Sequence, residues 1–223
     1  MKLEIYPDRE MMMLDLANTL AGELADFVRR DGRASFCVPG GTTPGPIFDT
    51  LSGVDLDWAK IAVFLNDERW VSEDHPRSNT ALIRNRLIRG NAAGATLIPL
   101  FADTSLPEDS LDALSEGLTP HLPISVLLLG MGTDMHTASL FPGADRLSDA
   151  LANDAPVLLP MRADTAGEPR ITLTARVLKD AMSCHILITG ADKRAALERA
   201  QTLTECEAPV KAVLANATVH WAE

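Results

Sequence analysis

The strongest constraint on the fold is an alternation between short, continuous apolar runs and longer segments with helical spacing. Continuous apolar runs are typical of strands that are buried on both faces, and such strands form mostly parallel sheets covered by helices. We therefore predict a Rossmann-like α/β fold, with a mostly parallel central sheet and helices on both faces. The candidate strands are 34–38, 61–65, 97–100, 124–129, 155–161, 184–190 and 210–215.

The segments between these runs carry helix signals. Apolar residues recur at helical spacing over 10–30, and the segments 79–88 and 107–120 are predicted helices as well. Thr43 followed by Pro44 predicts the N-cap and first residue of a further helix. The chain has 223 residues, with no internal repeat or long linker. This length and continuity favour one domain over 1–223.

Composition limits the classes of partner. The formal net charge is -11, which disfavours nucleic acid and anionic membranes as partners, and the aromatic content of 4% leaves little surface for stacking bases. The three cysteines have neither disulfide-framework nor zinc-ligand spacing. The first ten residues include acidic ones where a signal peptide would be apolar, and no apolar stretch is long enough to cross a bilayer. We expect a cytoplasmic protein that binds neither nucleic acid nor membranes.

Polar clusters follow four of the candidate strands. In an open α/β sheet, ligands bind beyond the carboxyl ends of the strands, so clusters placed there are candidates for one shared site. The convergence of glycine, acidic and basic residues and a histidine at these ends predicts an active site. The clusters are PGGTTPG (39–45), NDERW (66–70), GMGTDMH (130–136) and GADKR (190–194).

The first cluster has the features of an anion-binding loop. Gly40 and Gly41 allow the backbone to approach a ligand closely. Thr42 and Thr43 add hydroxyls at the start of a helix, where N–H groups suit a phosphate. The pattern is neither a Walker loop nor a dinucleotide-binding fingerprint. The alternative interpretation is a tight turn that only begins the helix.

Three basic residues and one acid could complete such a site. Arg69 could bind a phosphate or carboxylate through two hydrogen bonds, and Asp67 could orient a base or a substrate hydroxyl. Lys193 lies near a predicted helix start, where the dipole disfavours a cation unless an anion lies between them. Arg170 could reach the same anion. Alternatively, all four are solvated surface charges.

His136 is the candidate general base. A free imidazole titrates near pH 6.5, so it can accept a proton from water under neutral conditions, and Asp134 could bias its tautomer. The alternative is an ordinary loop histidine. His185, at the start of an apolar run, is expected to be structural. Neither a nucleophile motif nor metal-ligand spacing is present, so we expect no covalent acyl intermediate, no metal and no cofactor.

Together these motifs resemble the 6-phosphogluconolactonase family. The matching stretches are GGTTP (40–44), DERWVSEDHPRSN (67–79), GMGTDMHTASLFPG (130–143), RITLT (170–174) and GADK (190–193). The resemblance implies the fold of the glucosamine-6-phosphate isomerases. It also implies metal-independent hydrolysis of 6-phospho-D-glucono-1,5-lactone to 6-phosphogluconate, the second step of the oxidative pentose phosphate pathway.

The resemblance also implies residue roles. His136 would activate water, with Asp67 or Asp134 holding the imidazole or the substrate. The glycine loop with Thr42, together with Arg69 and Lys193, would surround the phosphate or the sugar hydroxyls. One residue departs from the family pattern, because Met135 stands where the family has glycine. If that position requires a positive φ, methionine strains the loop that carries His136.

Two other functions are compatible with the same architecture. In the glucosamine-6-phosphate isomerases the signature histidine leads toward Asn-Glu-Pro-Gly and the strand end reads Asp-Glu-Tyr, whereas this chain has TASLFPG (137–143) and DER (67–69). A non-catalytic sugar-phosphate sensor would need an added DNA-binding segment, and we expect none, because the first predicted helix begins almost at the start of the sequence. We expect a phosphosugar lactone as the partner and a monomer or weak homo-oligomer.

Overall fold

The centre of the protein is a seven-stranded sheet, seen in a computed structural model that describes residues 1–164 and 166–223. Its strand order is β1-β10-β9-β6-β2-β3-β5, and every neighbouring pair is parallel. The predicted parallel α/β fold is therefore confirmed. The strands are β1 (Lys2–Ile5), β2 (Ala34–Val38), β3 (Ile61–Leu65), β5 (Thr96–Leu97), β6 (Val126–Gly130), β9 (Ser183–Thr189) and β10 (Ala217–Ala222).

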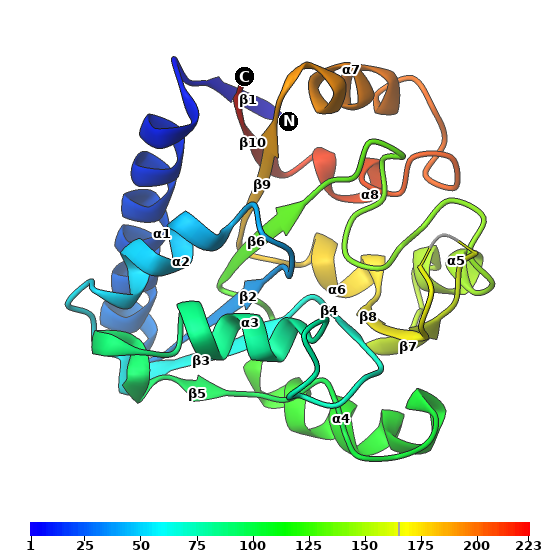
Figure 1. Ribbon diagram of the computed structural model, residues 1–223, viewed down its shortest axis with the longest axis horizontal. Coiled ribbons are helices and arrows are strands. Elements are labelled where there is room, and N and C mark those ends of the chain that lie inside the picture. Colours follow the sequence, from blue (N-terminus) through cyan, green and yellow to red (C-terminus); the bar gives the residue numbers. More distant parts are fainter. Residues whose placement is uncertain (165) are drawn as a thin grey trace.

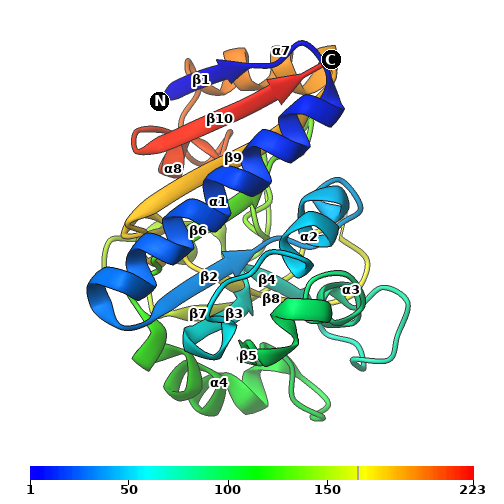
Figure 2. The same ribbon diagram turned by 90° about the vertical axis from the view of Figure 1, so that its left-hand side faces the viewer.

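Helices cover both faces of this sheet. In Figure 2, α1 (Arg9–Asp31) lies across one face, where it contacts β2, β6 and β10. In Figure 1, α6 (Ala175–Lys179) and α8 (Lys211–Leu214) lie on the other side. All five residues of both β2 and β3 are buried, as their continuous apolar runs predict. The remaining helices are α2 (Gly45–Ser52), α3 (Asn79–Arg86), α4 (Leu111–Leu118), α5 (Leu147–Leu151) and α7 (Ala191–Ala200).

The caps of α1 explain its boundaries. The Asp8 side chain accepts a hydrogen bond from the Met11 N–H at 2.8 Å, and Gly32 ends the helix with a φ of 75°. The predicted helix over 10–30 is thus confirmed. The predicted N-cap at Thr43 is wrong, because α2 begins at Gly45 and its N-cap is Pro44, which makes no side-chain hydrogen bond. A proline still lies in the first turn of α2, at Pro46, where the missing N–H is not needed.

A second, three-stranded antiparallel sheet was not predicted. Its order is β4-β8-β7, and its strands are β4 (Asp67–Arg69), β7 (Leu158–Met161) and β8 (Arg170–Leu173). The run 155–161 therefore belongs to this sheet and not to the parallel one. Only residues 162–169 separate β7 from β8, and a parallel crossover requires a dozen residues or more. This small sheet carries Asp67, Arg69 and Arg170 toward the central one.

The last predicted strand is also wrong. Within 210–215, residues Lys211–Leu214 form α8, and the final strand β10 follows at Ala217–Ala222. A short apolar run fits a buried helical turn as well as a strand, and here Ala212, Val213 and Leu214 are all buried. The edge strand β1 was missed because it is short and largely exposed.

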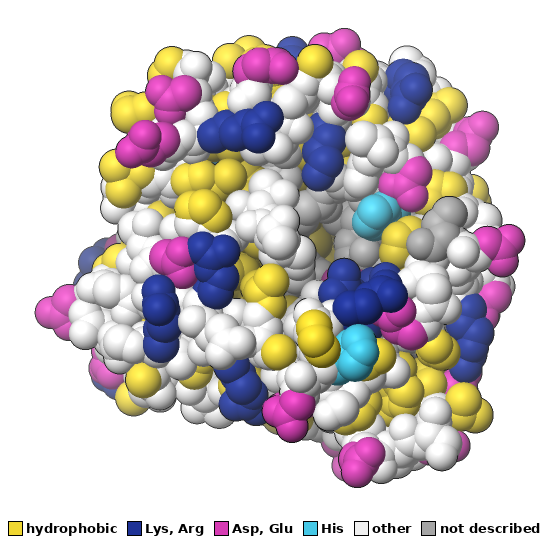
Figure 3. Space-filling view, in the orientation of Figure 1, with side chains coloured by type: hydrophobic (Ala, Val, Ile, Leu, Met, Phe, Trp, Pro, Cys, Tyr) yellow, Lys and Arg dark blue, Asp and Glu magenta, His cyan; other side chains and the backbone are white. Residues whose placement is uncertain are grey.

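The carboxyl ends of β2, β3, β6 and β9 open toward one side of the molecule. In Figure 3 the centre of this face is hollowed, and Lys and Arg side chains lie around the hollow. Among the described residues, no helix has both the length and the apolar character that crossing a bilayer requires.

Candidate active site

The hollow is a cavity of about 380 Å³ at the carboxyl ends of the central strands. A volume of this size suits a small ligand. Each of the four strand-end clusters contributes to its wall. Of the predicted site residues, the structure places seven on this cavity: Gly40, Gly41, Asp67, Arg69, His136, Arg170 and Lys193.

Two of the predicted site residues do not line the cavity. Thr42 is exposed and does not line the cavity, whereas the neighbouring Thr43 does. The reason is the turn before α2, in which Gly41 has a φ of 82° and Gly45 donates its N–H back to the Thr42 carbonyl at 3.2 Å. Asp134 does not line the cavity either, but it contacts His136, which does.

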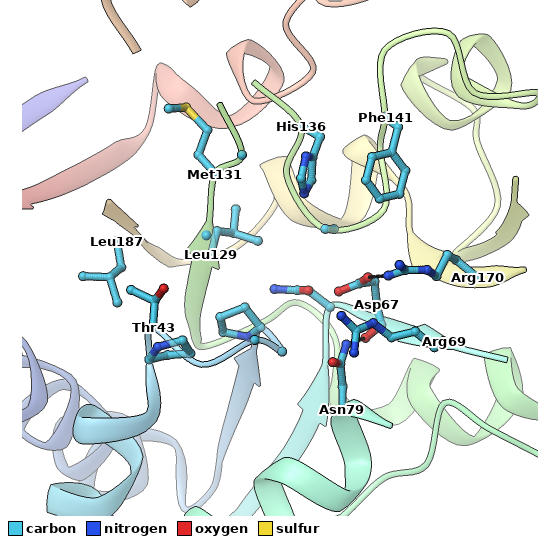
Figure 4. A pocket seen from close by; sticks show the side chains of 18 of the residues that line it. Thr43, Asp67, Arg69, Asn79, Leu129, Met131, His136, Phe141, Arg170 and Leu187 are labelled. Carbon is cyan, nitrogen blue, oxygen red and sulfur yellow. Dashed lines mark hydrogen bonds and ion pairs between the residues drawn. The ribbon is translucent and has the colours of Figure 1, made fainter. Parts of the chain in front are cut away.

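His136 is held by the carboxylate of Asp134. The Nδ1 atom of His136 lies 2.5 Å from Asp134 Oδ1, and the His136 backbone N–H donates to the same oxygen at 3.2 Å. Burial alone would raise the pKa of Asp134, but the hydrogen bond with His136, and the charge of the imidazole in its protonated form, lower it below its ordinary value. On its other side the imidazole packs against Phe141, with ring centroids 4.5 Å apart (Figure 4).

The loop around His136 is tightly constrained. Gly132 donates its N–H to the His136 carbonyl at 3.0 Å, and a Cβ on Gly132 would collide with the Asp134 carboxylate and the His136 ring. Glycine at 132 is therefore required for the contact between the acid and the imidazole.

Met135 occupies the left-handed region, with a φ of 66°, so methionine does stand at a position that favours glycine. Such a backbone costs about 1 kcal/mol or more for a residue with a Cβ. Two hydrogen bonds hold it, because Met135 donates its N–H to Gly132 and its carbonyl accepts from Val210, both at 3.0 Å. Its side chain also packs against the core. These contacts hold the loop that carries His136 with methionine at this position.

Asp67 belongs to a different group of contacts. Its Oδ2 accepts a hydrogen bond from the Ser139 hydroxyl at 2.5 Å and lies 3.7 Å from Arg170 Nη1. Figure 4 shows Asp67 directed at Arg170. Of the two acids predicted to hold His136, Asp134 is therefore the one in contact with it. The sequence interpretation missed Ser139, which is buried in the small-residue stretch after His136 and joins that loop to β4.

Two arginines provide the basic wall of the cavity. Burial lowers the pKa of Arg170, and the charge of Asp67 opposes that shift. Arg69 donates from Nη1 to the Arg77 carbonyl. In each arginine the buried Nε atom has no hydrogen-bond partner among the described residues, so each offers a donor for an anion.

Glu68, between Asp67 and Arg69, anchors this wall. Its buried carboxylate accepts hydrogen bonds from the Arg69 N–H at 2.8 Å, the Ser78 hydroxyl at 3.1 Å, and the Asn79 and Thr80 N–H groups at 2.8 and 2.7 Å. Burial raises its pKa, although these hydrogen bonds oppose the shift. Glu68 thus joins β4 to the N-terminus of α3. The sequence interpretation left it without a role.

Lys193 enters the cavity wall from the first turn of α7. It is half-buried, and burial lowers its pKa while the charge of Asp134 acts in the opposite direction. The arrangement therefore combines an imidazole backed by a carboxylate with three cationic side chains around one cavity. It can deprotonate water beside a bound anion.

Comparison with known proteins identifies the family. The chain matches the family described as glucosamine-6-phosphate isomerases/6-phosphogluconolactonase over residues 7–221. It is 38% identical to a 6-phosphogluconolactonase from Rhizobium meliloti, over 99% of this chain and 98% of the relative. It is 39% identical to one from Pseudomonas aeruginosa, over 98% and 94%.

Solved structures similar to this chain come from the same family. A 6-phosphogluconolactonase from Shewanella baltica superposes with a TM-score of 0.96 at 31% identity, covering 100% of this chain and 97% of that one. One from Thermotoga maritima gives a TM-score of 0.83 at 25% identity, covering 99% and 98%. This protein therefore belongs to the glucosamine-6-phosphate isomerase/6-phosphogluconolactonase family.

Proposed function

We propose that this protein hydrolyses 6-phospho-D-glucono-1,5-lactone to 6-phospho-D-gluconate, the second step of the oxidative pentose phosphate pathway. The observation that carries the proposal is the contact between His136 and Asp134 at the edge of a cavity with a basic wall. The relatives named 6-phosphogluconolactonase support the same reaction.

The contact with Asp134 favours one nitrogen of His136 as the base. A carboxylate accepts a hydrogen bond, so it favours the tautomer with the proton on Nδ1 and leaves the lone pair on Nε2. In the proposed first step, Nε2 removes a proton from water while the oxygen of that water attacks the lactone carbonyl. The imidazolium formed is stabilised by Asp134.

The second step opens the ring. The tetrahedral intermediate collapses, the bond between the carbonyl carbon and the ring oxygen breaks, and the imidazolium returns its proton to that oxygen. The product is the open-chain acid, and His136 is neutral again. Backbone N–H groups of the glycine turn at 40–43 would stabilise the negative oxygen of the intermediate, an effect often worth about 3–4 kcal/mol for a single donor.

The basic side chains would hold the phosphate. Arg69, Arg170 and Lys193 line the cavity, and each can donate to a phosphate oxygen. Gly40 and Gly41 allow the backbone to approach the ligand closely. In this assignment Asp67 fixes Arg170 and Ser139, and Thr42 is replaced by Thr43 as the hydroxyl at the cavity wall.

The setting of the reaction is part of the proposal. We assign residues 1–223 to one domain, which is supported by a hydrophobic core running from Met12 to Ala222. We also propose that the protein is a cytoplasmic monomer or weak homo-oligomer. The net charge of -11 argues against nucleic acid as a partner.

A coupled assay tests the function. Glucose 6-phosphate is oxidised enzymatically to the lactone, and the appearance of 6-phosphogluconate is followed with and without this protein, subtracting spontaneous opening. The protein should accelerate the appearance of product. As a control for the isomerase reaction, glucosamine 6-phosphate should release no ammonia. Ammonia release without lactone hydrolysis would contradict the proposal.

A further inference from the structure

Unsatisfied polar atoms concentrate at the cavity. Five buried side-chain atoms of the described residues lack a hydrogen-bond partner, and four of them belong to residues that line the cavity. Buried polar groups are nearly always paired in folded proteins, so such a concentration indicates where a ligand supplies the missing partners. Two of the four are the arginine Nε donors of Arg69 and Arg170. The other two are acceptors, the Oδ1 atoms of Asn66 and Asn79.

Asn66 is fixed where the two sheets meet. Its N–H donates to the Val38 carbonyl of β2, and its carbonyl accepts from Leu173 of β8, both at 2.9 Å. Its side-chain Nδ2 donates to the Leu128 carbonyl of β6 at 3.3 Å. Each of the other polar atoms of Asn66 therefore has a hydrogen-bond partner, and the residue is 0% exposed.

Asn79 is held in the same manner at the start of α3. Its N–H donates to Glu68, and its Nδ2 donates to the Asp67 carbonyl at 3.0 Å. Its amide lies over Gly40, where any Cβ would collide with it. In Figure 4, Asn79 lies below Asp67 and Arg69 on the same wall of the cavity. Its Oδ1 has no hydrogen-bond partner in the described part of the chain, although the residue is only 2% exposed.

The hydrogen bonds to the Leu128 and Asp67 carbonyls determine the orientation of the two side-chain amides. A carbonyl oxygen can only accept, so the amide atom facing Leu128 or Asp67 must be the nitrogen. The unpaired atom in each case is consequently the oxygen, an acceptor. An ionised phosphate offers only acceptors and cannot bond to it, whereas a hydroxyl group can donate. The cavity thus offers acceptors for hydroxyls in addition to the donors of Arg69, Arg170 and Lys193.

We propose that Asn66 and Asn79 are specificity-determining residues whose Oδ1 atoms accept hydrogen bonds from secondary hydroxyls of the ligand. The proposal rests on the proposed function for the class of ligand, a phosphorylated polyhydroxy acid or its lactone. It adds that the cavity selects for hydroxyls as well as for the phosphate. A ligand without hydroxyls leaves both acceptors buried and unpaired, which is the arrangement that discriminates most strongly against an analogue.

Binding of two acids tests this inference. 6-Phosphogluconate and 6-phosphohexanoate carry the same phosphate and carboxylate, but only the first has secondary hydroxyls. Their affinities are measured calorimetrically for the wild type and for Asn66→Ala and Asn79→Ala. Asn85→Ala is the matched control, because Asn85 is an exposed residue of the same helix as Asn79.

The wild type should bind 6-phosphogluconate at least about 100-fold more tightly than 6-phosphohexanoate. Each alanine variant should weaken 6-phosphogluconate binding about 10–100-fold and change 6-phosphohexanoate binding less than about 3-fold. The control should bind both acids as the wild type does. Equal affinity of the wild type for the two acids would overturn the inference, and this comparison needs no variant to fold. Equal losses for both acids in the variants would also overturn it.

These outcomes are independent of the proposed reaction. A wild type that prefers 6-phosphogluconate but leaves the lactone to open at its spontaneous rate would contradict the function and support the inference. A wild type that hydrolyses the lactone but does not distinguish the two acids would support the function and contradict the inference.

Discussion

The Nδ1 atom of His136 lies 2.5 Å from Oδ1 of Asp134, and the same oxygen also accepts the backbone N–H of His136. One carboxylate therefore fixes both the backbone and the ring of the proposed base. The contact with His136 lowers the pKa of Asp134, which favours the ionised carboxylate needed to hold the imidazole.

Asp134→Asn should lower kcat for lactone hydrolysis about 10–100-fold, because an amide neither enforces the Nδ1–H tautomer nor stabilises the imidazolium. Steady-state kinetics with the coupled assay measure the effect. Asp112→Asn is the control, since Asp112 is exposed on α4 and should leave kcat unchanged. An Asp134→Asn enzyme with wild-type kcat would show that the contact has no role in catalysis.

Glu68→Gln should destabilise the protein by about 2 kcal/mol and raise KM. In the variant, the NH₂ group of the amide would face N–H or hydroxyl groups that now donate to the carboxylate. Buried donors would then be left unpaired. Denaturant unfolding and steady-state kinetics test both effects. Glu116→Gln on the exposed face of α4 should alter neither. If Glu68→Gln matches the wild type in stability, the anchoring role assigned to Glu68 is wrong.

The strands and helices that position the site were largely predictable, because buried parallel strands leave a continuous apolar signal, as at 34–38 and 61–65. The apolar run at 210–215 was wrongly predicted to be a strand, because a short apolar run also fits a helical turn. The antiparallel sheet of β4, β8 and β7 depends on pairing between distant segments, which local patterns do not encode.

Site residues divided in a similar way. Side chains that follow the strands, such as His136 and Arg69, could be identified from type and position as candidates, and both line the cavity. Glu68 and Ser139 could not, because their roles consist of buried hydrogen bonds to residues remote in the sequence. Asn66 is a third case, since only its three anchoring bonds reveal that one oxygen is unpaired.

Met135→Gly should be more stable than Met135→Ala by about 1 kcal/mol. Both variants lose the methionine side chain, but only alanine keeps a Cβ at a φ of 66°. At an ordinary helical position the order would be reversed by a similar amount. Thermal and denaturant unfolding of the two variants measure the difference. Alanine as the more stable residue would contradict a strained backbone at this position.

Acid should destabilise the protein through His220. Its Nε2 lies 2.9 Å from Nδ1 of His185, and its Nδ1 lies 2.9 Å from the Tyr6 hydroxyl. Burial, followed by the charge of His185, lowers the pKa of His220 to about 4. Between pH 6.5 and about 4 the unfolded chain binds a proton that the folded one does not, so stability falls as the pH is lowered through this window.

The loss should reach at most about 3 kcal/mol, because each pKa unit is worth about 1.4 kcal/mol. Unfolding free energies of the wild type and of His220→Gln, measured between pH 7 and 4, test this. The variant should show a shallower dependence on pH. An identical slope in the two proteins would assign the acid sensitivity to other groups.

The most direct test of His136 as the base is the rate of lactone hydrolysis by a folded His136→Ala protein, with the spontaneous rate subtracted and folding verified by circular dichroism. The wild type should accelerate formation of 6-phosphogluconate, and kcat of the variant should be lower by about 10²–10⁴-fold. A folded variant that hydrolyses the lactone at nearly the wild-type rate would contradict the proposed mechanism.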